Sequence, residues 1–238
     1  MGTVVSIELA DDLPAARLTA LIESTCAWLH EVDARFSTYK EDSEVCRFRS
    51  GALPLDDCSA DLRHVLDRCA DLWRDTDGYF DAYAGGPLDP SGYVKGWSVE
   101  VASQRLAAAG STRHYIGAGG DIRMRGDRPW RVGVRHPWKA DKLAWVLSVT
   151  EGAVATSGTY ERGAHVWNPV AGRPATGLRS VTVVGPDLAV ADAYATAALA
   201  MGEPGLSWLA KRVADGYESA AVTDDGRAFT SAGLPVAT

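Results

Sequence analysis

The sequence predicts an α+β fold, in which mixed or antiparallel sheets are flanked by helices in one compact domain over residues 1–238. In the first half, two long segments carry apolar residues at the three- and four-residue spacing of an amphipathic helix. In the second half, short segments of strand character are separated by glycine-rich turns. Helices alternate with strand pairs that are close enough in sequence to form hairpins, which is typical of the α+β class.

Four kinds of segment fill the first half of the chain. Residues 1–9 alternate between apolar and polar side chains, as a half-buried strand does. Residues 13–36 and 59–76 each present a stripe of apolar side chains and are expected to be helices. FSTYKEDSEVCRF (36–48) indicates a polar turn followed by a short segment. Residues 77–96 are so rich in Gly, Pro and Asp that we expect no regular structure there.

The rest of the chain is expected to hold short strands and three more helices. A short helix covers residues 99–109, and two late helices cover 189–201 and 206–213. Residues 116–134 predict a strand, a glycine turn, a hairpin and a second strand. The candidate strands are 113–118, 130–135, 144–150, 152–156, 179–185 and 218–223.

Composition excludes several classes of protein. The formal net charge of -7 and the pI of about 5.2 imply no broad basic face, so nucleic acid is not expected as a partner. No segment approaches the roughly 18 consecutive apolar residues of a membrane span. The N-terminal residues lack a signal-peptide pattern, and the 4 cysteines fit neither a zinc site nor a redox pair. We therefore expect buried thiols and a cytoplasmic location.

Two glycine-rich segments carry residues suited to a phosphate group. GGPLDPSGYVKG (85–96) places Asp89 and open backbone carbonyls shortly before Lys95, so the segment can approach a phosphate and offer oxygens to a cation. GAGGDIRMRG (117–126) leads into Asp121 through two glycines, where backbone N–H groups can converge on an anion. The alternatives are an ordinary surface turn for the first segment and a hairpin turn for the second.

Two further segments carry imidazole, hydroxyl and carboxylate groups. ATSGTYERGAHVWNPVAGRPA (155–175) brings hydroxyl residues and an arginine close in sequence to His165, which suits a general base beside a phosphate. In VADAYATAALAMG (190–202), a helix would place Asp192 and Thr196 one turn apart on the same face, where a hard cation can partner the carboxylate. The alternatives are a structural His165 and an exposed or helix-terminal Asp192. Together, the four segments indicate a metal-assisted site for a pyrophosphate.

The order of these segments along the chain, and their amino-acid sequences, resemble those of the ApbE family of FAD:protein FMN transferases. The matching motifs, from residue 1 to about 202, are MGTVVSI, FSTYKEDSEV, GYFD, DPSGYVKGW, GGDIRMRG, TSGTYER, HVWNPVAG and ADAYATAALAMG. Departures from the family pattern occur at a short stretch between Asp81 and Asp89, at Asn168 where Asp is usual, and at Phe48 or Arg49 in place of an Asn. These departures affect the flavin pocket and the contact with the adenine side of FAD.

The resemblance implies a ligand set for FAD and Mg²⁺. The metal ligands would be Asp192, Thr196 and the carbonyl oxygen of Gly92. The loop of Gly119, Gly120 and Asp121 would form part of the site. The implied flavin contacts are Met1, Tyr39, Tyr79, Phe80, Asp81, Asp89, Lys95 and Val166.

The resemblance also implies a reaction. FMN would be transferred from FAD to a Thr or Ser hydroxyl of an acceptor flavoprotein that carries a flavinylation motif, with release of AMP. His165 would be the catalytic base, and Lys95 would offset charge on the pyrophosphate. Two alternatives share this site. One is a magnesium-dependent FAD pyrophosphatase that releases FMN and AMP, and the other is an FAD-binding protein without turnover.

Overall fold

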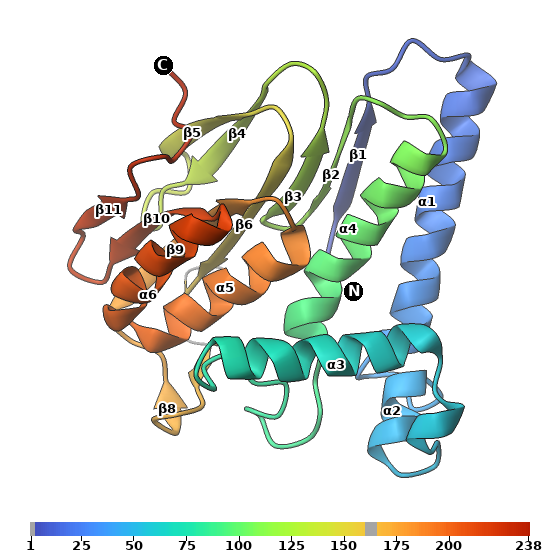
Figure 1. The fold of residues 1–238 in the computed structure, drawn as a ribbon, viewed down its shortest axis with the longest axis horizontal. Coiled ribbons are helices and arrows are strands. Elements are labelled where there is room, and N and C mark those ends of the chain that lie inside the picture. The colour runs from blue at the N-terminus through green and yellow to red at the C-terminus, as the bar shows by residue number, and fades with distance from the viewer. Residues whose placement is uncertain (1–2, 160–165) are drawn as a thin grey trace.

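The computed structural model describes residues 3–159 and 166–238 (Figure 1). Met1 and His165 lie outside these described residues. The helices are α1 (Ala15–Phe36), α2 (Glu44–Arg49), α3 (Ala60–Asp75), α4 (Ser91–Ala108), α5 (Leu188–Met201) and α6 (Pro204–Arg212), with 3₁₀ turns at Leu55–Asp57 and Val213–Asp215. The strands are β1 (Val5–Leu9), β2 (His114–Ala118), β3 (Asp121–Arg125), β4 (Trp130–Arg135), β5 (Leu143–Val149), β6 (Gly152–Gly158), β7 (Trp167–Asn168), β8 (Arg173–Pro174), β9 (Leu178–Gly185), β10 (Glu218–Thr223) and β11 (Ala228–Thr230).

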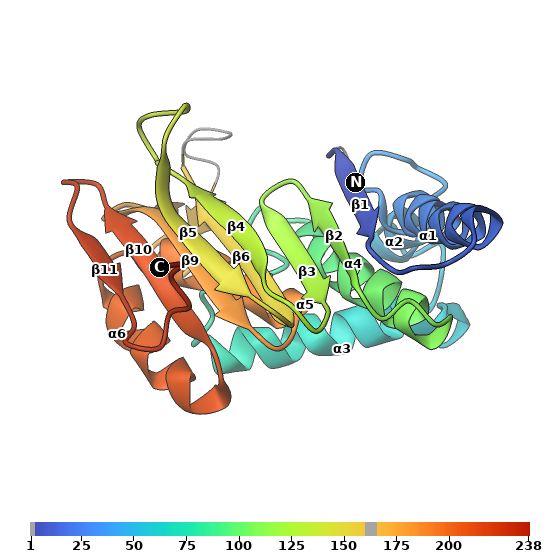
Figure 2. The ribbon, with the colours of Figure 1, turned by 90° about the horizontal axis from the view of Figure 1, so that it is seen from above.

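A seven-stranded sheet in the order β1-β2-β3-β6-β9-β10-β11 forms the centre of the fold, and every neighbouring pair in it is antiparallel. Helices α1, α4, α5 and α6 are neighbours in a row along one face, and α3 runs across their ends (Figures 1 and 2). The β4–β5 hairpin packs on the other face through a second apolar cluster that includes Met124 and Leu147. The structure therefore confirms the α+β class.

Most predicted elements are present within a few residues of the predicted bounds. Period-two alternation placed β4 at Trp130–Arg135 without error, and the long helices α1 and α3 follow their apolar stripes. Strand β11 and the short helix α2 were not predicted as such. Among the described residues, no helix is both long and apolar enough to cross a bilayer. That residues 1–238 form one domain stays a prediction.

The prediction of irregular structure up to residue 96, with a helix only from 99, is wrong. Helix α4 begins at Ser91, directly after Pro90, whose carbonyl accepts hydrogen bonds from the N–H groups of Tyr93 and Val94. The carboxylate of Asp89 accepts a hydrogen bond from the Ser91 N–H at 3.0 Å and stabilises the start of the helix. The two glycines inside the first turns lie against neighbouring elements, so packing compensates their low helix propensity.

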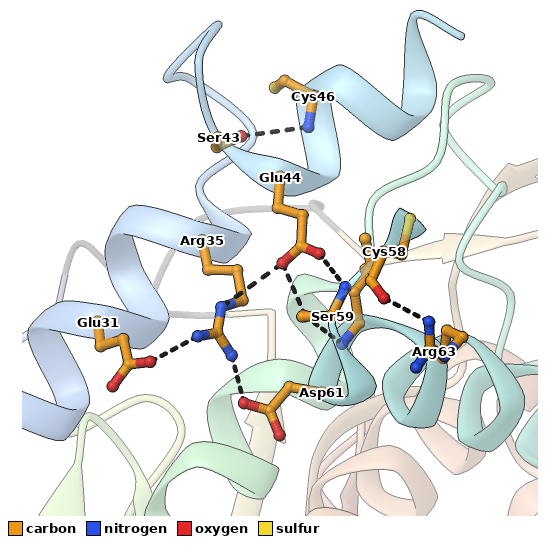
Figure 3. A network of polar contacts seen from close by, with 10 residues as sticks. Glu31, Arg35, Ser43, Glu44, Cys46, Cys58, Ser59, Asp61 and Arg63 are labelled. Carbon is orange, nitrogen blue, oxygen red and sulfur yellow. Dashed lines mark hydrogen bonds and ion pairs between the residues drawn. The ribbon is translucent and has the colours of Figure 1, made fainter. Parts of the chain in front are cut away.

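A polar network joins the end of α1 to α2 and to the start of α3 (Figure 3). Glu44 on α2 accepts hydrogen bonds from the backbone N–H and the hydroxyl of Ser59, which itself caps α3 by accepting from the Leu62 N–H. Arg35 on α1 pairs with Glu44 at 3.5 Å and also with Asp61. One carboxylate thus ties three helices together.

Replacing Glu44 by Ala is expected to lower the free energy of unfolding by about 1–3 kcal/mol, because the half-buried Ser59 donors and Arg35 lose their shared acceptor. Chemical denaturation followed by circular dichroism measures the loss. Glu31→Ala is the matched control, because Glu31 pairs with the same arginine at 2.5 Å but is half exposed. A change below about 0.5 kcal/mol is expected there, and equal losses in both variants would contradict the prediction.

His114 on β2 is a fully buried histidine between two serines. Its Nε2 lies 2.9 Å from the Ser103 hydroxyl oxygen, and its Nδ1 lies 3.0 Å from that of Ser111. Burial, reinforced by the nearby charge of Arg125, lowers the pKa of His114 to about 4. Because the unfolded chain would bind this proton near pH 6.5, the neutral imidazole stabilises the fold above that pH.

As the pH falls from about 6.5 to about 4, the unfolded chain binds a proton at His114 that the folded protein does not bind. The free energy of unfolding is therefore expected to fall by on the order of 3 kcal/mol. His114→Gln keeps a polar side chain but does not titrate. Urea denaturation of both proteins across this pH range should show a steeper loss of stability in the parent. Parallel pH profiles would show that His114 is protonated in the folded state as readily as in the unfolded chain.

Candidate functional site

Three charged side chains from three different elements meet at one end of the sheet. Lys95 on α4 forms an ion pair with Asp121 at the start of β3, and its Nζ lies 3.5 Å from Oδ2 of Asp192 on α5. Asp121 is 0% exposed and Asp192 is 3% exposed, whereas the Lys95 side chain is 33% exposed. We call these three residues the carboxylate cluster. It is buried on the protein side and open to solvent at the lysine.

The carboxylate cluster holds two carboxyl groups but one ammonium. The Oδ2 atoms of Asp121 and Asp192 are both buried, and among the described residues the ammonium of Lys95 is the ionic partner that they share. Burial and the neighbouring Asp121 carboxylate raise the pKa of Asp192 to about 8. Burial lowers the pKa of Lys95, but the two carboxylates outweigh it and the net shift is upward. A bound cation would favour the ionised form of Asp192 and give it a second partner.

Hydroxyl groups complete an oxygen-rich surrounding. Thr196 lies one helical turn beyond Asp192 on α5, and its hydroxyl oxygen lies 3.1 Å from that of Ser157 on β6. The Thr156 N–H donates to Asp121 Oδ1 at 3.2 Å, which fixes the orientation of that carboxylate. Ser157 was noted in the sequence only as one of several hydroxyls, and the structure brings it to Thr196.

The donor set fits Mg²⁺. Carboxylate, hydroxyl and carbonyl oxygens are hard ligands, and Mg²⁺ is commonly held by one or two carboxylates together with water and substrate phosphates. Two buried carboxyl groups that share one ammonium are the observation that supports the fit. Within residues 3–159 and 166–238 no group of three or more His, Cys, Asp or Glu side chains forms a complete metal cage. Gly92 lies in the first turn of α4, and its carbonyl keeps one lone pair beyond the helical hydrogen bond.

Gly96 is a site residue that the sequence did not single out. A Cβ atom at this position would lie 2.8 Å from the Leu188 carbonyl oxygen and 2.9 Å from the Ala189 Cα. It would also lie 3.1 Å from Cβ of Asp192. Helix α4 therefore approaches α5 at the level of the carboxylate cluster more closely than any side chain allows. The lysine before the glycine reaches Asp192 because of this contact.

Gly96→Ala is expected to destabilise the protein by about 1–3 kcal/mol, although the same change in an open helix is stabilising. The added methyl must push α5 away from α4, since backbone atoms cannot yield as a flexible side chain does. Thermal denaturation measures the effect. Gly85→Ala is the control, because a Cβ there meets nothing within 4 Å. An unchanged melting temperature for Gly96→Ala would show that the two helices separate at little cost.

The glycine loop before Asp121 lies next to β6. Gly119 has φ +64, a left-handed conformation that favours glycine, and its N–H donates to the Val4 carbonyl at 3.3 Å. A Cβ at Gly120 would lie 3.4 Å from the Thr156 carbonyl oxygen. The tight turn delivers Asp121 into the cluster as the first residue of β3. The structure thus joins this loop to Lys95, 26 positions earlier, which spacing alone does not reveal.

Two of the predicted flavin contacts, Phe80 and Asp89, lie at the start of α4. Phe80 is buried, and its ring faces Gly92, where an added Cβ would lie 3.3 Å from Cε2. The Asp89 N–H donates to the Ala82 carbonyl at 2.7 Å and closes the short loop. A cavity of about 300 Å³ adjoins this loop, lined by Phe48, Arg49, Tyr83, Gly86, Pro87 and Leu88. The shortened loop and residues 48–49, two of the departures noted in the sequence, therefore lie at one cavity, whereas Asn168 is on β7.

The structure leaves the remaining predicted flavin contacts less closely grouped. Tyr79 is half-buried in the turn that follows α3, and Asp81 accepts a hydrogen bond from the Tyr83 N–H at 2.8 Å. Tyr39 is 95% exposed on the α1–α2 connection. Val166 is buried, and its carbonyl accepts from the Ala175 N–H at 2.9 Å. The role of every predicted flavin contact and metal ligand stays a prediction, as do the roles of Met1 and His165 outside the described residues.

Comparison with known proteins identifies the family. A model of the ApbE family matches residues 1–88 and 83–219. The chain is 34% identical over 156 residues to the FAD:protein FMN transferase of Rhodobacter capsulatus, covering 60% of this chain but 29% of that protein. It is 32% identical over 130 residues to the one from Vibrio cholerae, covering 49% of this chain and 39% of that protein. The matches thus span well under half the length of these relatives.

Solved structures share the fold. The ApbE protein of Thermotoga maritima superposes with a TM-score of 0.87 at 23% identity, covering 97% of this chain and 94% of that one. The flavin transferase ApbE of Vibrio cholerae gives a TM-score of 0.81 at 23% identity, covering 98% and 94%. Together with the family model, which covers most of the sequence, these findings show that the chain belongs to the ApbE family.

Proposed function

We propose that this protein is a magnesium-dependent FAD:protein FMN transferase. The observation that carries the proposal is the carboxylate cluster, in which two buried carboxyl groups share one solvent-facing lysine. A divalent cation can bind the second carboxyl group and, at the same time, an anionic substrate such as a pyrophosphate. The names of the relatives supply the substrate, FAD, and the reaction.

Asp192, Thr196 and the Gly92 carbonyl would hold Mg²⁺ in this site. When bound, the ion would supply positive charge that offsets the negative charge on the bridging oxygen, whose bond to the FMN-side phosphorus breaks and which leaves with AMP. Lys95 binds a phosphate oxygen from the solvent side, and Asp121 holds the ammonium in place through its ion pair. The flavin lies along Tyr39, Tyr79, Phe80, Asp81, Asp89 and Val166.

His165 acts as the general base. It takes the proton from a Thr or Ser hydroxyl of the acceptor flavoprotein, whose oxygen then attacks the phosphorus on the FMN side. The new phosphoester joins FMN to the acceptor, and AMP leaves. The acceptor carries a short flavinylation motif. The cytoplasmic location expected from the sequence stays a prediction.

The test is a reaction of the purified protein with FAD, Mg²⁺ and a small flavoprotein domain bearing the acceptor motif. Intact mass spectrometry follows the acceptor, and chromatography follows the nucleotides. The expected result is an acceptor heavier by one FMN residue and an equal amount of AMP, both abolished by EDTA. Free FMN and AMP with an unmodified acceptor would instead establish the pyrophosphatase. Intact FAD retained by the protein would leave an FAD-binding protein without turnover.

A further inference from the structure

A second, fully buried ion pair lies beneath the carboxylate cluster and joins the same three elements. Arg123 on β3 and Glu100 on α4 are 4% and 5% exposed, and the Arg123 Nε lies 2.8 Å from Glu100 Oε2. The same Oε2 accepts a hydrogen bond from the Leu188 N–H in the first turn of α5 at 3.1 Å. We call Glu100 and Arg123 the buried brace. It contacts α4, β3 and α5, as the cluster does.

The spacing along each element links the buried brace to the cluster. Arg123 follows Asp121 by two positions on β3, so both side chains point to the face that carries the helices. Leu188 precedes Asp192 by four positions on α5, so the N–H held by Glu100 lies one turn from the carboxylate. A shift of either element relative to α4 would therefore move one carboxylate relative to Lys95.

The brace and the cluster differ in their balance of charged groups. Arg123 Nη1 donates to the carbonyls of Met124 and Gly152, both at 2.8 Å, and Gln104 donates to Glu100 Oε1 at 3.3 Å. The brace thus pairs one cation with one anion, and these further hydrogen bonds hold both side chains in place. The cluster has two carboxyl groups, on β3 and α5, for the one ammonium of Lys95 on α4. The brace is therefore a contact that can hold β3 and α5 against α4 while the cluster has no cation bound.

We propose that Glu100 and Arg123 are positioning residues that hold Asp192, the proposed metal ligand, and Asp121, which orients Lys95, at the separation needed to bind a divalent cation together with an anionic substrate. The inference rests on the proposed function, because that function supplies the cation and FAD. The brace touches neither ligand. It acts through the backbone of β3 and through the first turn of α5.

The test compares the Mg²⁺ dependence of FAD binding with stability. Glu100→Gln keeps the size and the acceptor for Leu188 N–H but removes the charge that pairs with Arg123. We expect the Mg²⁺ concentration for half-maximal FAD binding, followed by flavin fluorescence, to rise about tenfold, a range typical for the loss of a group that orients a metal ligand. Saturating Mg²⁺ should restore FAD binding and transfer to the parent level. Arg123→Lys keeps the charge and should give a smaller rise.

Two controls separate positioning from general destabilisation. Glu151→Gln breaks the 3.0 Å ion pair that the half-exposed Glu151 side chain forms with Arg125 on β3, the strand that carries Arg123. This variant should leave the Mg²⁺ dependence unchanged. Leu62→Ala removes buried side-chain volume on α3, outside the three elements that the brace joins. It should lower the melting temperature and keep the parent's Mg²⁺ dependence. If Glu100→Gln and Arg123→Lys behave in the same way, the brace has only a structural role. If the parent itself binds no FAD with Mg²⁺, the proposed function fails first.

Discussion

Asp192→Asn is expected to lower the rate of FMN transfer by about a thousandfold or more, while the metal-free protein becomes more stable than the parent. The loss follows because a neutral amide is a poor ligand for Mg²⁺, and a bound metal ion contributes several kcal/mol of charge stabilisation in the transition state. The gain follows because Asp192 is a buried carboxylate that shares one lysine with Asp121. The unfolded chain ionises Asp192 above about pH 4, so folding must either protonate this carboxyl group or bury its charge, and a neutral amide avoids that cost.

The two effects have opposite signs, so they can be measured in one preparation. Differential scanning calorimetry in EDTA should show a melting temperature higher by roughly 2–4 °C, the shift that about 1 kcal/mol gives in a protein of this size. Adding Mg²⁺ and FAD should stabilise the parent but not Asp192→Asn, since a ligand stabilises only the state it binds. A variant that still gains stability from Mg²⁺ and FAD would remove Asp192 from the ligand set.

Asp187→Asn provides a matched control for this experiment. Asp187 caps the same helix by accepting a hydrogen bond from the Val190 N–H at 3.0 Å, and burial raises its pKa as well. Asn caps a helix as effectively as Asp. Transfer should stay near the parent rate in this variant. A comparable loss in both variants would point to the charge of α5 as a whole rather than to the Asp192 carboxylate.

The sequence predicted those features of the fold that depend on neighbouring positions. Alternation marks β4 and the other hairpin strands because each pleat exposes every second side chain, whatever the strand packs against. The one-turn spacing of Asp192 and Thr196 needed only that residues 188–201 be helical, which they are. The placement of Asp192 and Thr196 on one face of a helix could therefore be predicted without knowledge of any tertiary contact.

The start of α4 could not be predicted in the same way. Pro90, Gly92 and Gly96 each weaken a helix when considered alone, and their sum indicated irregular backbone. In the structure, α5 lies so close to Gly96 that a side chain would not fit there, and Gly92 faces the Phe80 ring. These reasons are tertiary. The same holds for the Lys95–Asp121 pair and for the buried brace, whose partners are separated by more than 20 positions and meet only when the sheet and helices assemble.

His165→Ala is expected to lower the rate of transfer by about 10²–10⁴-fold, which corresponds to the contribution of a positioned general base. FAD and Mg²⁺ binding should be retained, because the binding residues proposed from α4, β3 and α5 are untouched. The measurement is single-turnover labelling of the acceptor by intact mass, with FAD binding followed in parallel by fluorescence. Added imidazole should restore part of the rate, since it can accept the proton in place of the missing side chain.

His30→Ala is the control for this last variant, because His30 is exposed on α1 and contributes to no proposed contact. It should transfer FMN at the parent rate. If His165→Ala also transfers at the parent rate, the acceptor hydroxyl loses its proton by another route and His165 is not the base. If instead His165→Ala fails to bind FAD, the histidine belongs to the binding site. A loss of rate with intact binding and imidazole rescue is the pattern that only a general base produces.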